Sequence, residues 1–210
     1  MHPDLTTSAA TTAKSPIDLA VVIPPSRRKR DLPPDGLGIA ARDLYLGRQH
    51  RAMVSTIDAL RQARPDISIA LFIVSSRYGL LAEQDLVVPY TSILGSSPRQ
   101  WRETGDRVHL HERLCQPLYE ARYVLYCLSV AYLTAARAPF EGPGTAFYLT
   151  ASGSLPPADI TLIPAGRHEA RTFGISERDI RARILRVLCA TILQGGIEVL
   201  ESRATKRVSS

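Results

Sequence analysis

The chain has 210 residues, a formal net charge of +6 and a composition in which 45% of the residues are hydrophobic. This length is typical of one ordinary domain, which buries a sufficient core without metal or disulfide cross-links. The composition excludes a fibrous or disulfide-framework protein, and no apolar run is long enough to predict a membrane span. The excess of cations, most of them arginine, favours an anionic partner such as nucleic acid.

The predicted elements lie between two polar ends of the chain. Residues 1–15 are rich in serine, threonine and alanine, and we expect them to be disordered. Residues 202–210 form a basic tail that we expect to fray, which leaves a single α/β domain over residues 16–201. We expect no signal peptide. Three widely spaced cysteines indicate buried free thiols and a reducing, cytoplasmic location: Cys115, Cys127 and Cys189.

Strand and helix patterns alternate along the first half of the chain. Residues 18–24 form a short apolar run, which predicts a buried strand. Residues 40–63 carry apolar side chains at helical spacing and predict one helix, which Pro65 ends. Residues 67–75 predict the clearest buried strand, and residues 86–90 predict a short extended segment.

The second half continues the alternation. Ser97 and Pro98 are typical of a helix start, and the predicted helix runs over residues 99–121, with Gly105 as the point where it would break. Ser176, three residues before Asp179, predicts the start of a last helix. Glycines at 195 and 196 are expected to end or kink it. Three further strands are predicted, at residues 123–130, 147–150 and 160–163.

This order predicts an α/β fold with a mainly parallel sheet and helices on both faces. In such sheets ligands bind beyond the carboxyl ends of the strands. Two loops are therefore candidates for a site, residues 25–30 after the first strand and residues 75–85 after the second.

The first candidate loop contains four successive cations. Arginine and lysine at a strand end are suited to holding phosphate, although a solvated basic loop has the same composition. These residues are Ser26, Arg27, Arg28, Lys29 and Arg30. Asp43 follows at the start of the predicted helix, where it is either a catalytic carboxylate or an acid that suits the helix dipole.

The second candidate loop combines small, cationic and aromatic residues. Ser76 and Arg77 follow the strand directly, and Tyr78 and Tyr90 are suited to stacking on a base. Asp85 is suited to orienting water. The alternative is a polar loop in which Tyr78 fills the core. After a late strand, His168 is placed either to assist a leaving group or in a surface turn.

The order of these segments resembles a known family. The first strand and its loop read VVIPPSRRKR, ARDLYLG follows, and the second strand continues into SSRYGLL with Asp85 and Pro89–Tyr90 downstream. Over residues 17–91 this resembles small bacterial proteins related to the peroxide-stress protein group and to domains attached to tRNA-guanine transglycosylases. Pro25, Ser76–Arg77 and Thr91 depart from the Cys, Ala-Lys and Asp of that family.

The resemblance implies a uracil-DNA-glycosylase-like three-layer sandwich. It also implies an enzyme that flips out a modified base and cleaves its N-glycosidic bond. A hypermodified phage base such as glucosylated hydroxymethylcytosine is one such substrate, with antiviral defence as the role. The implied roles are a carboxylate at the sugar (Asp43 or Asp85), base contacts (Tyr78, Tyr90, Ser76, Arg77), phosphate contacts (Ser26, Arg27, Arg28, Lys29, Arg30) and a donor to the leaving base (Arg77 or His168).

Two other functions fit the same residues. One is a non-catalytic module that binds nucleic acid or recognises damage, and the other is an enzyme that processes a free nucleoside or nucleotide. In each case we expect no metal, no cofactor and no membrane partner. Nucleic acid, DNA rather than RNA, is the expected partner, and a monomer is the favoured oligomeric state.

Overall fold

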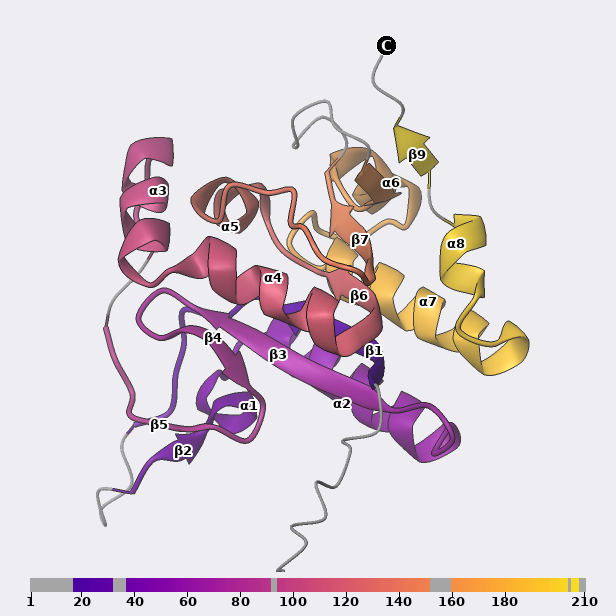
Figure 1. Ribbon diagram of the computed structural model, residues 1–210, viewed down its shortest axis with the longest axis horizontal. Helices are drawn as coiled ribbons and strands as arrows, with labels where there is room; N and C mark the ends of the chain where they lie inside the picture. The colour runs from indigo at the N-terminus through magenta and orange to yellow at the C-terminus, as the bar shows by residue number, and fades with distance from the viewer. Residues whose placement is uncertain (1–16, 32–36, 92–93, 152–159, 204, 208–210) are drawn as a thin grey trace, which may run out of the picture.

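A computed structural model describes residues 17–31, 37–91, 94–151, 160–203 and 205–207 (Figure 1). The predicted disorder of residues 1–15 concerns a segment outside these ranges. The described part of the chain forms a seven-stranded sheet in the order β4-β3-β1-β6-β7-β8-β9, and a two-stranded sheet of β2 (Ile39–Ala40) and β5 (Leu86–Val87).

The inner strands of the large sheet are parallel, as expected. They are β3 (Ile69–Ser75), β1 (Ile17–Ile23), β6 (Ala121–Tyr126), β7 (Thr145–Thr150) and β8 (Ile160–Pro164). The edge strands β4 (Gly79–Ala82) and β9 (Thr205–Arg207) pair antiparallel with β3 and β8. The chain goes from β1 to β3 on one side and then to β6 on the other. The strand order therefore reverses between β1 and β6, which is where doubly wound sheets open a ligand crevice.

Helices cover both faces of the sheet because its strands are apolar on both sides. In β1, Leu19 and Val21 belong to one core cluster, whereas Ala20 and Val22 belong to the other. On the first face, α2 (Arg48–Ala63) packs against α7 (Ile180–Gly195). The other face is covered by α3 (Pro98–Arg107), α4 (Leu110–Glu120) and α5 (Val130–Ala135), on the opposite side of the sheet (Figure 1).

The helix predicted over residues 40–63 is interrupted. A short helix, α1 (Ala41–Leu44), ends at Tyr45, whose backbone is extended, and α2 begins at Arg48. Tyr45 forms an isolated antiparallel bridge with Lys29, flanked by hydrogen bonds from Arg30 N–H to Leu44 C=O and from Leu46 N–H to Arg28 C=O. Pairing with residues 28–30 thus places extended chain between the two helices.

Three predictions for the second half are also corrected. The helix over residues 99–121 breaks after α3, where His109 has a left-handed backbone (φ 50°), and not at Gly105, which is buried inside α3. The strand predicted over residues 123–130 ends at Tyr126, and its last residue, Val130, begins α5. Ser176 donates to Asp179, which itself precedes α7, so Ser176 is not the capping residue.

Other elements were expected as loops or tails. β4 lies in the predicted loop over residues 75–85, and α6 (Arg167–Thr172) and α8 (Val199–Arg203) were not predicted. Residues 205–207 form β9 instead of fraying, because they extend the sheet beside β8. Gly196 does follow the last residue of α7 with a positive φ of 80°, as predicted for a helix end.

Candidate functional site

The carboxyl edge of the sheet gathers buried polar side chains. Ser75 and Ser76 at the end of β3 and Thr150 at the end of β7 are almost completely buried. A polar group deep in a fold needs a hydrogen-bond partner. Their position at the strand ends, beside the reversal between β1 and β6, makes this edge the candidate site.

A chain of three hydroxyl groups runs through this edge. The Ser75 Oγ atom lies 2.8 Å from the Tyr90 hydroxyl, which lies 2.8 Å from the hydroxyl of Tyr45. Ser75 Oγ accepts the backbone N–H groups of Arg77 and Tyr78, at 3.2 and 3.1 Å. Both acceptor positions of Ser75 are therefore used, so Ser75 donates its proton to the Tyr90 hydroxyl, whereas either phenol is able to donate between Tyr90 and Tyr45. Burial and the neighbouring Tyr90 raise the pKa of Tyr45, which keeps this phenol protonated.

The basic loop, residues 26–30, lies against the hydroxyl chain. Lys29 places its ammonium 4.3 Å from the centre of the Tyr90 ring and 6.0 Å from that of Tyr45. Burial lowers the pKa of Lys29. Ser26 donates to Arg28 C=O at 2.6 Å and accepts the N–H of Gly47 at 2.9 Å, which fastens the loop to the start of α2. Ser26 is thus occupied in the fold.

The other loop cations face outward. Arg27, Arg28 and Arg30 are exposed and form no ion pair with a described residue. Guanidinium groups in this position are available to an anion arriving from solvent. The charges of these three predicted phosphate contacts are therefore not neutralised by any described residue. Lys29, in contrast, lies over the ring of Tyr90.

Tyrosines from four segments meet here, and we call Tyr45, Tyr78, Tyr90 and Tyr132 the tyrosine cluster. Tyr78 and Tyr90 are in edge contact, with ring centres 5.5 Å apart at 89°. The Tyr78 hydroxyl donates to Val88 C=O, and its ring lies 5.6 Å from the Arg77 guanidinium. Tyr132, on α5, is close enough to Tyr90 and Arg27 to interact electrostatically, and burial raises its pKa. Tyr132 was not predicted, because the apolar strand pattern extends to residue 130 and masks the start of α5.

The two candidate carboxylates differ. Asp85 accepts the N–H of Ala82 at 2.9 Å, and its C=O accepts the N–H of Ala41, so it closes the turn after β4. Asp43 is exposed on α1, two residues before Tyr45, and has no hydrogen bond or ion pair within the described ranges. Neither carboxylate hydrogen bonds to the tyrosine cluster. Asp43 is the one that remains available to water or substrate.

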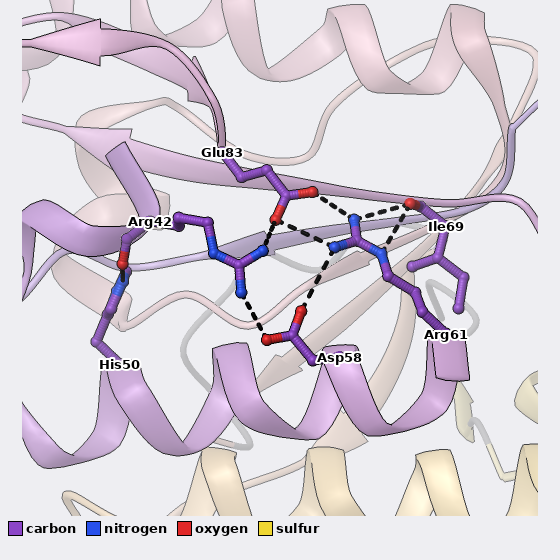
Figure 2. A network of polar contacts seen from close by, with 6 residues as sticks. All are labelled: Arg42, His50, Asp58, Arg61, Ile69 and Glu83. Carbon is purple, nitrogen blue, oxygen red and sulfur yellow. Dashed lines mark hydrogen bonds and ion pairs between the residues drawn. The ribbon is translucent and has the colours of Figure 1, made fainter. Parts of the chain in front are cut away.

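An ion network holds the segment that carries Asp43 and Tyr45 (Figure 2). Glu83, only 13% exposed, accepts from Arg42 at 2.8 Å and from Arg61 at 2.5 Å. Asp58 on α2 accepts from Arg42 at 2.5 Å. Burial alone would lower the pKa of Arg42, but the carboxylates of Asp58 and Glu83 raise it. The network fixes α1 to α2 and to the chain after β4, so its role is positional.

His168 lies away from this group. It is exposed on α6, directly after β8, and β8 is separated from β1 by β6 and β7. At the usual strand spacing this is roughly 14 Å along the edge. The structure therefore does not bring His168 together with the tyrosine cluster, whereas Arg77 lies beside it.

Other expectations concern metals, thiols and membranes. In the described ranges no three His, Cys, Asp or Glu side chains are grouped so that they would hold a metal ion. Cys127 and Cys189 are buried free thiols, as predicted, and Cys115 is partly exposed. None of the described helices combines the length and apolar character that a membrane crossing requires.

Comparison with known proteins identifies no relative. No family model, no curated protein and no solved structure matches the chain. The function must therefore be argued from the site itself.

Proposed function

We propose that this chain binds a nucleic-acid strand across the carboxyl edge of β3, β1 and β6. The backbone phosphates lie on the arginines of the basic loop, and an unpaired base lies beside the tyrosine cluster. The observation that supports this proposal is the meeting of three outward arginines with four tyrosines at the point where the strand order reverses.

The arginines supply the sequence-independent part of binding. Arg27, Arg28 and Arg30 stand on a loop that Ser26 and the bridge to Tyr45 hold in place, so little chain entropy is lost when they bind phosphate. Planar guanidinium groups bind phosphate oxygens in pairs. Each phosphate neutralised also releases counterions, which makes such binding sensitive to salt.

The tyrosines supply a surface for a base. Tyr78 and Tyr90 are half-buried, and each ring has a cation above it, Arg77 and Lys29 respectively. A base that stacks on either ring takes the place of the cation, which is then free to contact the base edge or the adjacent phosphate. Stacking contributes about 1–3 kcal/mol per base in such sites. A base reaches them only from a single strand or after flipping out of a duplex.

We propose hydrolysis of the N-glycosidic bond as the reaction. The bond from the sugar carbon to the base breaks first, and the base leaves with the bonding electrons. Asp43, the free carboxylate, takes a proton from the water whose oxygen bonds to that carbon. Arg77 stabilises the negative charge on the departing base, which ends with a proton from the medium. The uracil-DNA-glycosylase-like sandwich and the relationship to the peroxide-stress group belong to this proposal, and the two-sided parallel sheet supports them.

A binding module without catalysis is the second candidate. It is favoured by one observation, namely that neither Asp43 nor Asp85 is hydrogen bonded to the tyrosine cluster. In that case, the basic loop and the tyrosines bind the strand, Asp85 serves the fold, and Asp43 takes part in no reaction. The third alternative, an enzyme for a free nucleotide, predicts that a mononucleotide competes fully with a strand for the site.

Base release distinguishes these functions. The purified protein is incubated with a panel of genomic DNAs that includes phage DNAs with hypermodified bases. Abasic sites are scored by alkaline cleavage and released bases by mass spectrometry. We expect release from one modified DNA, reduced at least about a hundredfold in Asp43→Asn, since general-base catalysis contributes 10²–10⁴-fold. Glu120→Gln, an exposed acid at the end of α4, is the matched control and keeps full activity.

Binding is measured in parallel by fluorescence anisotropy with single-stranded and duplex DNA. Tyr90→Phe removes the hydroxyl between Ser75 and Tyr45 but keeps the ring, so it tests the hydroxyl chain separately from stacking. If binding is salt-sensitive but no DNA or RNA releases a base, the result supports the non-catalytic binding module. Absence of both binding and release refutes the proposed function.

A further inference from the structure

Arg181 is a partly buried cation that forms no ion pair with any described residue. It lies in the first turn of α7, and its Nε atom is buried with no hydrogen-bond partner. Within the described residues its guanidinium forms no hydrogen bond and no ion pair. Arginine is almost never buried unpaired, because removing its charge from water costs several kcal/mol when nothing compensates it.

The neighbours of Arg181 do not supply the missing charge. The groups that interact electrostatically with Arg181 are the Cys127 thiol and the Glu177 carboxylate. Burial raises the pKa of Cys127, so this thiol is neutral at physiological pH. Glu177 is directed to another cation, the Nε of Arg167, at 3.3 Å. Burial correspondingly lowers the pKa of Arg181.

Two further unpaired groups lie along the same edge. The buried side-chain atoms of the described residues that lack a partner are Arg181 Nε, Gln49 Nε2 and Thr150 Oγ1. Gln49 is in the first turn of α2, which His50 and Gly47 tie to the chain leaving β1. Thr150, completely buried, is the last residue of β7. Buried polar groups without a partner at this edge are available to a polar ligand.

The two long helices of one face begin at this place. Arg48 at the start of α2 forms an ion pair with Asp179, which precedes α7, so the two helix N-termini are held together. Cys127 directly follows β6, which places Arg181 on the β6 side of the strand reversal. The basic loop, in contrast, leaves β1, and Tyr78 and Tyr90 lie at the end of β3.

We propose that Arg181 binds a phosphate group at the carboxyl end of β6, as a second anion subsite distinct from the basic loop. The guanidinium supplies the charge and a planar pair of donors, and the N–H groups at the start of α7 add to it. Gln49 Nε2 is a further donor at the same edge. A phosphate offers several acceptor oxygens to such donors, whereas chloride is a single acceptor. This subsite requires no glycosylase activity, and its test is independent of base release.

A purely structural role for Arg181 makes the opposite prediction. The aliphatic stem of an arginine covers apolar surface while its head reaches water. In that case truncation lowers stability in every buffer, and phosphate has no specific effect. The experiment must therefore compare stability with and without the anion.

The test measures thermal unfolding and calorimetric binding of the whole chain in a buffer free of phosphate and sulfate. Inorganic phosphate, a nucleoside monophosphate and a single-stranded oligonucleotide are titrated separately, each against sodium chloride at equal ionic strength. The variants are Arg181→Gln, which keeps a polar group of similar length, and Arg181→Lys, which keeps the charge. Arg186→Gln is the control, because Arg186 is exposed on the same helix.

We expect at least one phosphate compound to raise the unfolding midpoint of the wild type saturably. Arg181→Gln weakens this binding by about tenfold or more, since a hydrogen bond to a charged group contributes that much. Arg181→Lys retains part of the phosphate binding, and Arg186→Gln retains all of it. Without anion, Arg181→Gln is at least as stable as the wild type, because it removes an uncompensated charge.

The response also identifies the source of the phosphate. A response to inorganic phosphate or the monophosphate assigns a free small molecule, and a response to the oligonucleotide alone assigns a strand. If no phosphate compound acts beyond matched chloride, or if Arg181→Gln responds as the wild type does, the subsite does not exist. A failure of base release leaves these results unaffected.

Discussion

At the scale of single residues, His50 connects the first turn of α2 to Pro24, which lies just before the basic loop. It is 2% exposed, and its Nδ1 and Nε2 atoms each lie 3.2 Å from a carbonyl oxygen, of Pro24 and Arg42 respectively. A neutral imidazole has one N–H and can donate to only one of the two, whereas an imidazolium can donate to both. Desolvation by burial lowers the pKa of His50, against the opposing effect of the two carbonyls and of Asp43, and Arg42 adds to the lowering. The neutral form is therefore favoured in the fold.

The sign of the pH effect follows from this shift. Because the pKa is lower in the folded than in the unfolded chain, His50 contributes stability above its ordinary pKa, and this contribution is lost as the pH falls below it. We expect the difference in unfolding free energy between the wild type and His50→Gln to shrink between about pH 7.5 and about pH 5. Urea denaturation at each pH measures it. A difference that grows in acid would instead show an imidazolium that donates to both carbonyls.

At the scale of elements, a glycine sets the distance between two helices on the other face. Gly105 is buried in α3, and a β-carbon added there would lie 2.0 Å from the carbonyl oxygen of Ala135, the last residue of α5. Alanine normally stabilises a helix relative to glycine by about 1 kcal/mol. Here the clash is with backbone, which has no rotamer to relieve it. We expect Gly105→Ala to lower the unfolding free energy by about 1–3 kcal/mol, as overpacking does.

Chemical denaturation of Gly105→Ala beside Arg102→Ala tests this. Arg102 is exposed on the same helix, so its replacement is expected to change stability by less than about 0.5 kcal/mol. If Gly105→Ala is as stable as the wild type or more stable, α3 and α5 do not approach each other this closely. Because α5 also carries Tyr132, a displaced α5 would alter the tyrosine cluster as well.

The elements differ in how far the sequence predicts them. The inner strands were recognised because they are unbroken apolar runs buried on both faces, a local property of the sequence. The sequence does not predict β4, because its four residues form a strand by pairing with β3 and begin at Gly79, which has a positive φ. The break at Tyr45 likewise depends on its bridge to Lys29, which lies far back in the chain. Long-range pairing therefore overrode a helical pattern that was locally consistent.

The residues of the candidate site likewise divide into those that the sequence predicts and those that it does not. Residues 26–30 and 75–78 were expected at one edge because the carboxyl ends of parallel strands meet there, and β1 and β3 are adjacent and parallel. Tyr132 and Arg181 reach this edge from helices that come later in the chain. Helical periodicity marks apolar positions. It gives no sign that a tyrosine completes a cluster or that an arginine lacks a partner, because both depend on neighbours distant in sequence.

At the scale of the whole molecule, the formal charge of +6 leaves open where the positive charge acts. At the amino edge of the sheet, Arg64 pairs with Asp66 at 2.7 Å and Arg122 with Glu198 at 3.2 Å. At the carboxyl edge, Arg27 and Arg28 are exposed without acidic partners among the described residues. The two amino-edge arginines are therefore already paired with carboxylates, whereas Arg27 and Arg28 are available to an approaching polyanion. The affinity for a polyanion then depends on where the unpaired arginines lie, and not on the total charge of the protein.

Two double variants separate these contributions, because each removes two positive charges. We expect Arg27→Gln with Arg28→Gln to weaken DNA binding strongly at low salt. It should also reduce the slope of log K against log salt by about 0.7–0.9 for each phosphate that these arginines no longer neutralise. Arg64→Gln with Arg122→Gln should change the affinity little and leave the slope unchanged, since those cations are already neutralised. Anisotropy titrations over a salt series measure both quantities. Equal losses in the two variants would mean that the strand responds only to net charge, and the carboxyl edge would then not be its binding site.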